Sequence, residues 1–207
     1  MSAETADDTN NNEGPRRPRN RRDLILEAAI DLFHQNGYPA TGVDDIGEAV
    51  DVSGPAIYRH FTSKEEILLD AIRLAADEVY SANKVALASG AQSAVLLEAF
   101  IRAYARVAIQ RSALIAVWTS EARHLNPARR SPMSKRLRAW RDEWVEVLLT
   151  VRPEINVELG TVLVGGAIGL ITTVATTNRT NADSPNEALL EDRAVAMAMA
   201  ALNAEIH

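Results

Sequence analysis

The sequence predicts an all-α protein, in which an N-terminal three-helix, helix-turn-helix head precedes a larger helical body. Apolar residues recur at helical spacing along most of the 207 residues, and aromatic residues make up only 5% of them. A short segment that begins at Gly54-Pro55 ends in Tyr58, Arg59 and His60, which can all hydrogen-bond an anion. A short helix of this kind, following another short helix and a tight corner, is typical of a DNA-recognition element.

The composition narrows the class of protein. Hydrophobic residues make up 47% and charged residues 24% of the chain, as in ordinary soluble globular proteins. Cysteine is absent, which excludes disulfides and thiolate metal sites and fits a reducing cytoplasm. The N-terminal residues are polar and acidic and are followed by no apolar stretch, so we expect a cytoplasmic protein without a signal peptide.

The net charge of −6 is unusual for a DNA-binding protein, but the charge is unevenly distributed. Residues 1–15 carry four acids and no base, whereas residues 16–22 carry five arginines and no acid. Nucleic-acid affinity depends on local phosphate contacts more than on total charge. We therefore expect residues 1–19 to form a disordered tail with a basic arm. A solvated linker with a chance basic cluster is the alternative.

Local signals place the elements of the head. A helix is expected over residues 21–36, ended by Asn36-Gly37. Thr41 is expected to cap a second short helix, with Asp51 in the corner after it. A third helix should run from a Ser53 cap to about His60, and a long helix should start after Ser63, which is in capping-box register with Glu66.

These motifs together resemble a known family. The runs Gly37-Tyr38-Pro39-Ala40-Thr41, Ser53 to Phe61, and Ser63-Lys64-Glu65-Glu66 look like the N-terminal domain of the TetR family of bacterial repressors. The resemblance covers about residues 20–70, in family order and without a gap. It implies an all-helical homodimer with a DNA-binding head over residues 20–66 and a ligand-binding, dimerising body over residues 67–207.

The resemblance also implies which residues contact DNA. The positions that match phosphate contacts of the family are Thr41, Ser53, Tyr58, His60 and Lys64. Lys64 has a second argument, because a cation in the first turn of a helix opposes the helix dipole unless an anion answers it. Gly54 and Ala56 match positions near base edges, and Arg59 is a candidate for a guanine or a phosphate. Core packing is the alternative for Tyr58 and His60.

Four positions depart from the family pattern. Asp51 replaces the corner glycine, and Gly42 stands where a second hydroxyl often helps to cap the second helix. Gly54 replaces a frequent lysine, and Asp44 replaces a frequent base. These changes remove phosphate contacts from the head, which raises the expected importance of the arginine tract. Within that tract, Arg17, Arg19 and Arg22 are candidates for backbone or minor-groove contacts, as in homeodomain arms.

The body is expected to contain further helices joined by short loops. Apolar periodicity and turn residues place these helices over residues 64–88, 92–110, 114–125, 133–151, 159–178 and 186–205, with a loop over residues 126–132. The stretch from Leu159 to Asn178 carries no charge and contains Gly165-x-x-x-Gly169, so a membrane span is weighed. Polar interruptions favour a helix buried on most sides, and we expect no membrane partner.

The resemblance implies that the last two helices of each chain form a four-helix dimer seam. Candidate seam residues are Val162, Gly165, Gly169, Ile171, Leu190, Ala194 and Met197. Ligand sites in helical bundles are mostly apolar with a few polar groups, so we expect a lipophilic effector that carries a polar or anionic group. Candidate walls are Phe100, Tyr104, Trp118, Trp140 and Trp144, and candidate polar anchors are Arg102, Arg123 and His124. Core packing is the alternative for the aromatic residues.

An enzyme and a protein-interaction scaffold are the rival classes. His34, His60, His124 and His207 lack metal-ligand spacing, and no phosphate loop or nucleophile motif is present. We therefore expect neither catalysis nor a cofactor nor a metal. The sequence favours a ligand-responsive repressor that binds a near-palindromic double-stranded DNA operator as a homodimer and is released by a small molecule.

Overall fold

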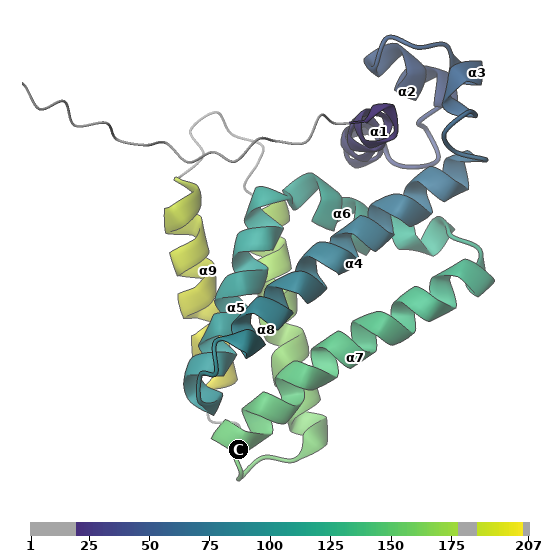
Figure 1. The fold of residues 1–207 in the computed structure, drawn as a ribbon. Coiled ribbons are helices and arrows are strands. Elements are labelled where there is room, and N and C mark those ends of the chain that lie inside the picture. Colours follow the sequence, from purple (N-terminus) through teal and green to yellow (C-terminus); the bar gives the residue numbers. More distant parts are fainter. Residues whose placement is uncertain (1–19, 178–185, 205–207) are drawn as a thin grey trace, which may run out of the picture.

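A computed structural model describes residues 20–177 and 186–204 of the chain. Within these ranges all regular elements are helices, which confirms the all-α fold class (Figure 1). The expected tail over residues 1–19, including Arg17 and Arg19, lies outside the described residues.

The head consists of α1 (Arg21–Asn36), α2 (Val43–Ala49) and α3 (Gly54–Ile57), gathered at one end of α4 (Lys64–Ala88) (Figure 1). Apolar side chains from all four helices meet in a small core. Its fully buried members include Ile25, Phe33, Ile46, Ile57 and Ile67. Because each helix has one apolar face, the polar faces are left toward solvent.

The first helix has the predicted ends. Asn20 caps it, with its side-chain oxygen accepting a hydrogen bond from the backbone N–H of Asp23 at 3.0 Å. Gly37 follows the helix with φ of 80°, and its N–H donates to the carbonyl of Phe33 at 3.0 Å. Glycine adopts this positive φ without steric cost, so the helix ends where the sequence predicts.

The second and third helices differ from prediction in their ends. Gly42, and not Thr41, is the N-cap of α2, and the carboxylate of Asp45 accepts a hydrogen bond from the Gly42 N–H at 2.7 Å. The regular part of α3 ends at Ile57. The chain continues to His60 in tighter turns, in which the His60 N–H donates to the Ile57 carbonyl at 2.9 Å.

Asp51 forms the corner between α2 and α3 with φ of 56°. Among the described non-glycine residues it alone has positive φ, and aspartate tolerates this region better than most residues.

We expect Asp51→Gly to raise the free energy of unfolding by up to about 1 kcal/mol and Asp51→Val to lower it by about 1–2 kcal/mol, because a β-branched residue is strained there. Urea unfolding of both variants measures this difference, and equal stabilities would contradict it.

The long helix α4 starts as predicted. The hydroxyl oxygen of Ser63 accepts a hydrogen bond from the Glu66 N–H at 3.1 Å, and the Glu66 carboxylate in turn accepts bonds from the backbone N–H and hydroxyl of Thr62. The helix then runs without interruption from the head into the body, ending before Ser89. The expected boundary between head and body therefore falls inside a continuous helix.

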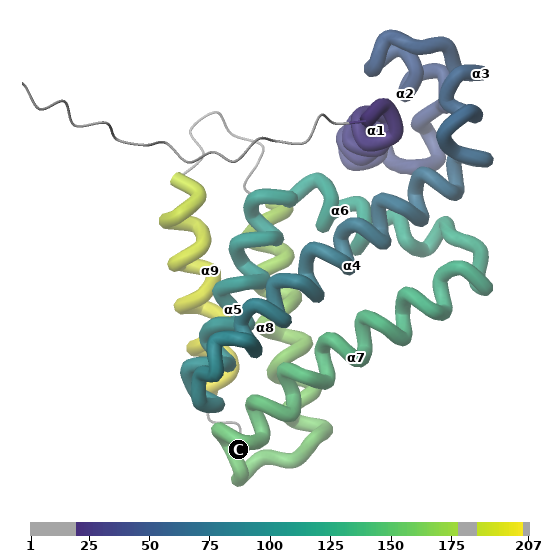
Figure 2. Tube along the Cα trace, in the orientation of Figure 1, coloured from purple at the N-terminus to yellow at the C-terminus, as the bar shows by residue number. Residues whose placement is uncertain are grey.

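The body consists of the rest of α4 and the helices that follow it (Figure 2). These are α5 (Ser93–Gln110), α6 (Ser112–Glu121), the short 3-10 helix η1 (Ala122–His124), α7 (Pro127–Val151), α8 (Val157–Thr177) and α9 (Glu187–Leu202). Helix α5 lies centrally and contacts α4, α7, α8 and α9. Its Phe100 and Tyr104 pack with Trp140 and Trp144 of α7 into an aromatic cluster.

The prediction of a loop over residues 126–132 is wrong, because this segment forms the first turns of α7. Asn126 caps the helix by accepting a hydrogen bond from the Ala128 N–H at 2.9 Å, and Pro127 occupies the first turn, where a missing N–H costs nothing. Pro132 lies inside the helix. The backbone N–H of Asn126 also donates to Glu65 on α4 at 2.7 Å, so a tertiary contact fixes this start.

Helix α8 is less buried than predicted. Only 33% of its most apolar stretch is buried, and Val162 is 68% exposed. The glycines Gly165 and Gly169 are exposed, and an added Cβ at either would meet no atom within 4 Å. Within the described part of the chain, α8 is the one helix long and apolar enough to cross a membrane.

The structure corrects part of the expected dimer seam. Ile171 of α8 and Ala194 of α9 are completely buried within their own chain, because they pack in the body core, and Leu190 is half-buried. Met197 is exposed on α9, as Val162 is on α8. Of the expected residues, those that are exposed on the neighbouring helices α8 and α9 are Val162, Gly165, Gly169 and Met197, and we call this set the exposed stripe.

Candidate nucleic-acid interface and ligand cavity

The segment from Ser53 to His60 has one buried and one outward face. Ile57 is completely buried, whereas Tyr58 is 55% exposed and Arg59 is exposed. Ala56 and His60 are half-buried. The Arg59 guanidinium has no hydrogen bond or ion pair with the described residues, so it is available to a partner.

Ser53 stands at the N-cap position of α3, but its side chain makes no capping hydrogen bond. The prediction of a side-chain cap is therefore wrong, and the exposed hydroxyl is left toward solvent. Pro55 in the first turn reduces the need for such a cap, because it has no N–H to satisfy.

Contrary to the prediction, Gly54 does not face outward. It is buried, and a Cβ at this position would lie 1.8 Å from a carboxylate oxygen of Asp44 and 3.0 Å from its Cγ. The missing side chain allows α3 to approach Asp44 of α2 closely. Gly54 therefore has a packing role within the head and does not approach base edges.

Two further residues expected at phosphates have partners inside the head. Thr41 is only 1% exposed, and its hydroxyl donates to the backbone carbonyls of Gly37 at 2.9 Å and Leu32 at 3.2 Å. The Lys64 ammonium donates to the carbonyls of Tyr38 and Thr41 at 2.8 Å each, and lies 4.4 Å from the centre of the Tyr38 ring. These carbonyl oxygens stabilise the cation, so Lys64 connects the segment between α1 and α2 to the first turn of α4.

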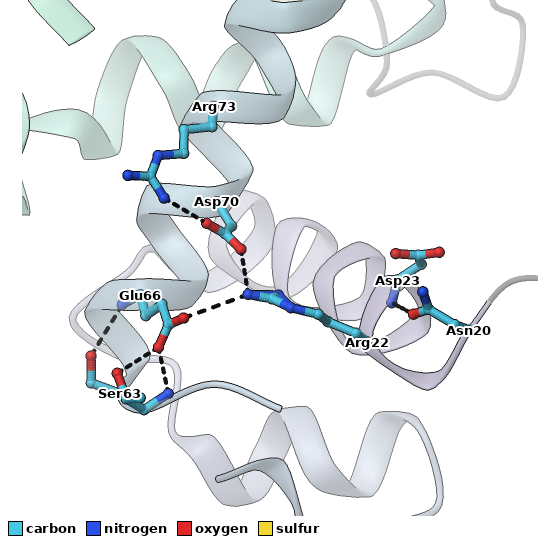
Figure 3. Close-up of polar contacts among 8 residues, drawn as sticks. Asn20, Arg22, Asp23, Ser63, Glu66, Asp70 and Arg73 are labelled. Atoms are coloured by element: carbon cyan, nitrogen blue, oxygen red, sulfur yellow. Dashed lines mark hydrogen bonds and ion pairs between the residues drawn. The ribbon is translucent and has the colours of Figure 1, made fainter. Parts of the chain in front are cut away.

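Arg22 is also part of the head and not of a DNA-binding arm (Figure 3). Its guanidinium lies 2.7 Å from the Asp70 carboxylate and 3.5 Å from that of Glu66, and stacks 3.9 Å from the centre of the Phe61 ring. Hydrogen bonds from Thr62, followed in importance by the charge of Arg22, lower the pKa of Glu66 and keep it ionised. Arg22 therefore joins α1 to α4.

Two polar clusters connect the head to the body. The buried Glu121 of α6 accepts a hydrogen bond from the Tyr38 N–H at 3.2 Å and lies 3.4 Å from the His124 ring nitrogen. The His124 ring stacks on that of Tyr38 at 5.4 Å between centres. In the second cluster, Arg111 pairs with Glu27 of α1 at 2.8 Å and Glu78 of α4 at 3.2 Å. His124 thus belongs to the junction with the head and not to a ligand site.

A cavity of about 320 Å³ lies in the body between α4, α5, α6, η1, α7 and α8. Its lining is mostly apolar. The lining residues are Ile72, Tyr104, Trp118, Thr119, Ala122, Leu125, Arg130, Met133, Ser134, Leu137, Trp140, Ile168 and Thr172. Of the expected walls, Tyr104, Trp118 and Trp140 are among them.

The other expected ligand residues lie elsewhere. Phe100 and Trp144 are completely buried and stack on each other behind the cavity wall, with 5.8 Å between ring centres. Arg102 lies on the surface and pairs with Asp192 at 2.8 Å, so it is no ligand anchor. Arg123 is exposed and donates a hydrogen bond to its neighbour, His124.

Sequence reasoning missed Arg130, Met133, Ser134 and Leu137, which line the cavity from α7. Pro132 favours a loop on sequence grounds, and such a loop would separate Arg130 from the helix that presents it. The pair Asn126-Pro127 was the available signal, because a capping side chain followed by proline is typical of a helix start.

Comparisons with known proteins agree with this arrangement. The family model described as bacterial regulatory proteins, tetR family, matches residues 25–71. The HTH-type transcriptional repressor KstR2 of Rhodococcus jostii (strain RHA1) is 31% identical over 167 residues, covering 77% of this chain and 78% of that protein.

Solved structures share the fold. A TetR-family transcriptional regulator from Bordetella parapertussis 12822 has a TM-score of 0.78 at 23% identity, over 88% of this chain and 95% of that one. AibR, whose crystal structure is a complex with isovaleryl coenzyme A and operator DNA, has a TM-score of 0.72 at 20% identity, over 86% of this chain and 97% of its own.

Proposed function

This chain belongs to the TetR family of bacterial regulatory proteins, and from this premise we propose that it is a ligand-responsive transcriptional repressor in the cytoplasm. It would bind a near-palindromic operator as a homodimer, with a head over residues 20–66 and a body over residues 67–207. The observation that carries this proposal is the outward face of the segment from Ser53 to His60, which we call the recognition segment. Its exposed Arg59 has no partner among the described residues.

In the proposed complex each head inserts the segment from Ser53 to His60 into a major groove. Ser53, Tyr58 and His60 would contact phosphates, Ala56 would approach a thymine methyl group, and Arg59 would bind a guanine or a phosphate. Arg17 and Arg19 would add contacts along the backbone or in the minor groove. Support comes from the exposure of the segment and from the concentration of arginine before α1.

The homodimer would form through the exposed stripe on α8 and α9. Val162, Gly165, Gly169 and Met197 would lie in this seam, because they are apolar or small and are exposed in the single chain. Glycines without atoms near their Cβ positions allow close approach of a partner helix. A two-fold axis along this seam would present the two heads to half-sites about one helical turn apart.

A small lipophilic effector would occupy the body cavity, whose lining is mostly apolar. AibR, a protein of the same fold, has been crystallised in complex with both isovaleryl coenzyme A and operator DNA, which supports the proposal that this chain binds a small molecule as well as DNA. The effector would favour a state with wrongly spaced heads, and a coupling of roughly 1–3 kcal/mol would change DNA affinity about 5- to 150-fold.

The test of DNA binding uses the full chain and a library of random duplexes. Repeated selection should enrich a near-palindromic sequence, and the logarithm of the binding constant for it should fall linearly with the logarithm of salt concentration, by a slope of about 0.9 per phosphate contacted. Enrichment of no sequence, together with a flat salt dependence, would favour an interaction scaffold over a regulator.

Removing residues 1–19 is expected to weaken binding to the selected operator and to reduce the salt slope by about two, because Arg17 and Arg19 would each leave a phosphate. The deletion spares Asn20 and Arg22, which hold α1 in place. Fluorescence anisotropy at several salt concentrations measures the slope. An unchanged salt slope after this deletion would show that the arginine tract is only a linker.

A further inference from the structure

The polar groups of the body cavity divide into those that already have partners and those that do not. Thr119, Ser134 and Thr172 each donate their hydroxyl proton to the carbonyl four residues earlier, at 2.9, 3.1 and 2.8 Å. Thr172 then accepts from the Tyr104 hydroxyl at 2.7 Å. Burial raises the pKa of Tyr104 to about 12, so Tyr104 keeps its proton for this bond. Each of these hydroxyls carries one proton, so none is left for a ligand.

Two donors in the lining have no partner among the described residues. The indole N–H of Trp140 is buried without an acceptor, and its nitrogen has almost no accessible surface, so a ligand oxygen reaches it only when the neighbouring side chains shift slightly. Arg130 is the one charged residue among those lining the cavity, and its guanidinium makes no ion pair or hydrogen bond with the described residues. A buried donor without an acceptor is costly, so a ligand that brings an acceptor would be favoured.

These two donors lie at different depths. Arg130 is exposed, so it stands at the mouth of the cavity, whereas Trp140 is buried. Ten residues of helix separate them, which corresponds to about 15 Å along the axis of α7. The wall between them is apolar and includes Leu125, Met133 and Leu137.

The first half of α7, which carries Arg130, has charges of one sign. Residues 127–141 contain six basic residues and no acid. Two of these bases have carboxylate partners on α4, because Arg136 lies 2.6 Å from Asp77 and Arg129 lies 3.9 Å from Glu65. Arg130 has no such partner, so it favours an anion over a neutral or cationic group.

We propose that the cavity binds an amphiphilic organic anion, whose acid group pairs with Arg130 and whose neutral carbonyl-type oxygen accepts a hydrogen bond from Trp140. A volume of about 320 Å³ is sufficient for the roughly ten non-hydrogen atoms of a medium-length chain, if each takes up about the 30 Å³ of a water molecule, with the acid group outside this volume at the mouth. This inference rests on the proposed function for its biological meaning, since the same cavity would hold the effector. The affinity of the cavity for this anion can be measured in the absence of DNA.

The test is isothermal titration calorimetry of the full chain with decanoate, 9-oxodecanoate and 1-decanol. Decanoate should bind roughly two- to fivefold more tightly than the alcohol of equal chain length, because it adds a charge-assisted bond to Arg130, whose exposure to water weakens the pair. The ketone of 9-oxodecanoate should add about another fivefold through Trp140.

Two variants and a control assign these gains. Arg130→Gln should bring decanoate and 1-decanol to nearly equal affinity, and Trp140→Phe should remove only the gain from the ketone. Arg138→Gln replaces an exposed arginine of the same helix that does not line the cavity, and should change neither ratio. The thermal unfolding of each variant shows that it is folded before titration.

The inference is overturned if decanoate binds no better than 1-decanol, if its advantage survives Arg130→Gln, or if none of the three compounds binds. The ketone gain must also disappear in Trp140→Phe. Addition of each ligand to the complex with selected operator separates the two proposals. Binding with the stated dependence on Arg130 but without any change in DNA affinity supports this inference, and removes the anion from the role of effector.

Discussion

Replacing Arg59 with glutamate is expected to lower affinity for the selected operator roughly 100-fold or more, at physiological salt, without changing the thermal unfolding of the protein. The guanidinium is exposed and has no partner among the described residues, so folding does not depend on it. Its loss would remove the proposed contact to DNA, and the new carboxylate would repel the phosphates. Anisotropy titrations and differential scanning fluorimetry measure the two properties.

Arg138→Glu is the matched control for Arg59→Glu. It makes the same change of charge at an exposed arginine of α7, in the body, and it should leave operator affinity within a few-fold of the wild type. Equal losses from both variants would show that total charge, and not the recognition segment, determines binding. A lower melting temperature in Arg59→Glu alone would show that Arg59 contributes to the fold.

Lys64→Met is expected to destabilise the head by about 2 kcal/mol and to weaken DNA binding with little change in the salt slope. The methionine retains most of the apolar stem but loses the ammonium, which donates to the carbonyls of Tyr38 and Thr41. Hydrogen bonds to charged groups contribute about 1.5–3 kcal/mol each, and the partial exposure of Lys64 reduces this value. DNA binding would weaken because the segment before α2 is no longer hydrogen-bonded to α4.

The salt slope distinguishes the two interpretations of Lys64. A phosphate contact would reduce the slope by about one and leave stability unchanged, which is the outcome that would contradict the structural assignment. Lys135→Met, at an exposed lysine of α7, is the control and should alter neither stability nor DNA affinity. Urea unfolding and anisotropy at several salt concentrations provide both measurements.

Elements with local signals could be predicted from the sequence. The end of α1 at Asn36-Gly37, the corner at Asp51 and the start of α4 after Ser63 all depend on residues within one turn of the boundary. The outward face of the recognition segment was also predictable, since Ile57 and Phe61 are apolar whereas Tyr58 and Arg59 are polar.

The roles of individual polar residues were less predictable, because their partners are distant in the sequence. Lys64 meets Tyr38 26 positions earlier, and Arg22 meets Asp70 48 positions later, so both have partners inside the head that sequence spacing does not reveal. A second group of incorrect predictions arose because the sequence does not show how deeply each side chain is buried. Trp140 lines the cavity and Trp144 is hidden behind it, although the two stand one helical turn apart and are of the same residue type.

The continuity of α4 makes it a rigid lever. Its 25 residues extend about 37 Å, with Lys64 holding the head at one end and Ile72 touching the cavity about two turns later. A tilt of about 5° around the far end would swing the first turn by about 3 Å, given that length. In a two-fold assembly both heads would move together, while the pitch of B-form DNA stays fixed. A displacement too small to disturb the packing of the body would therefore leave the two recognition segments out of register with their grooves.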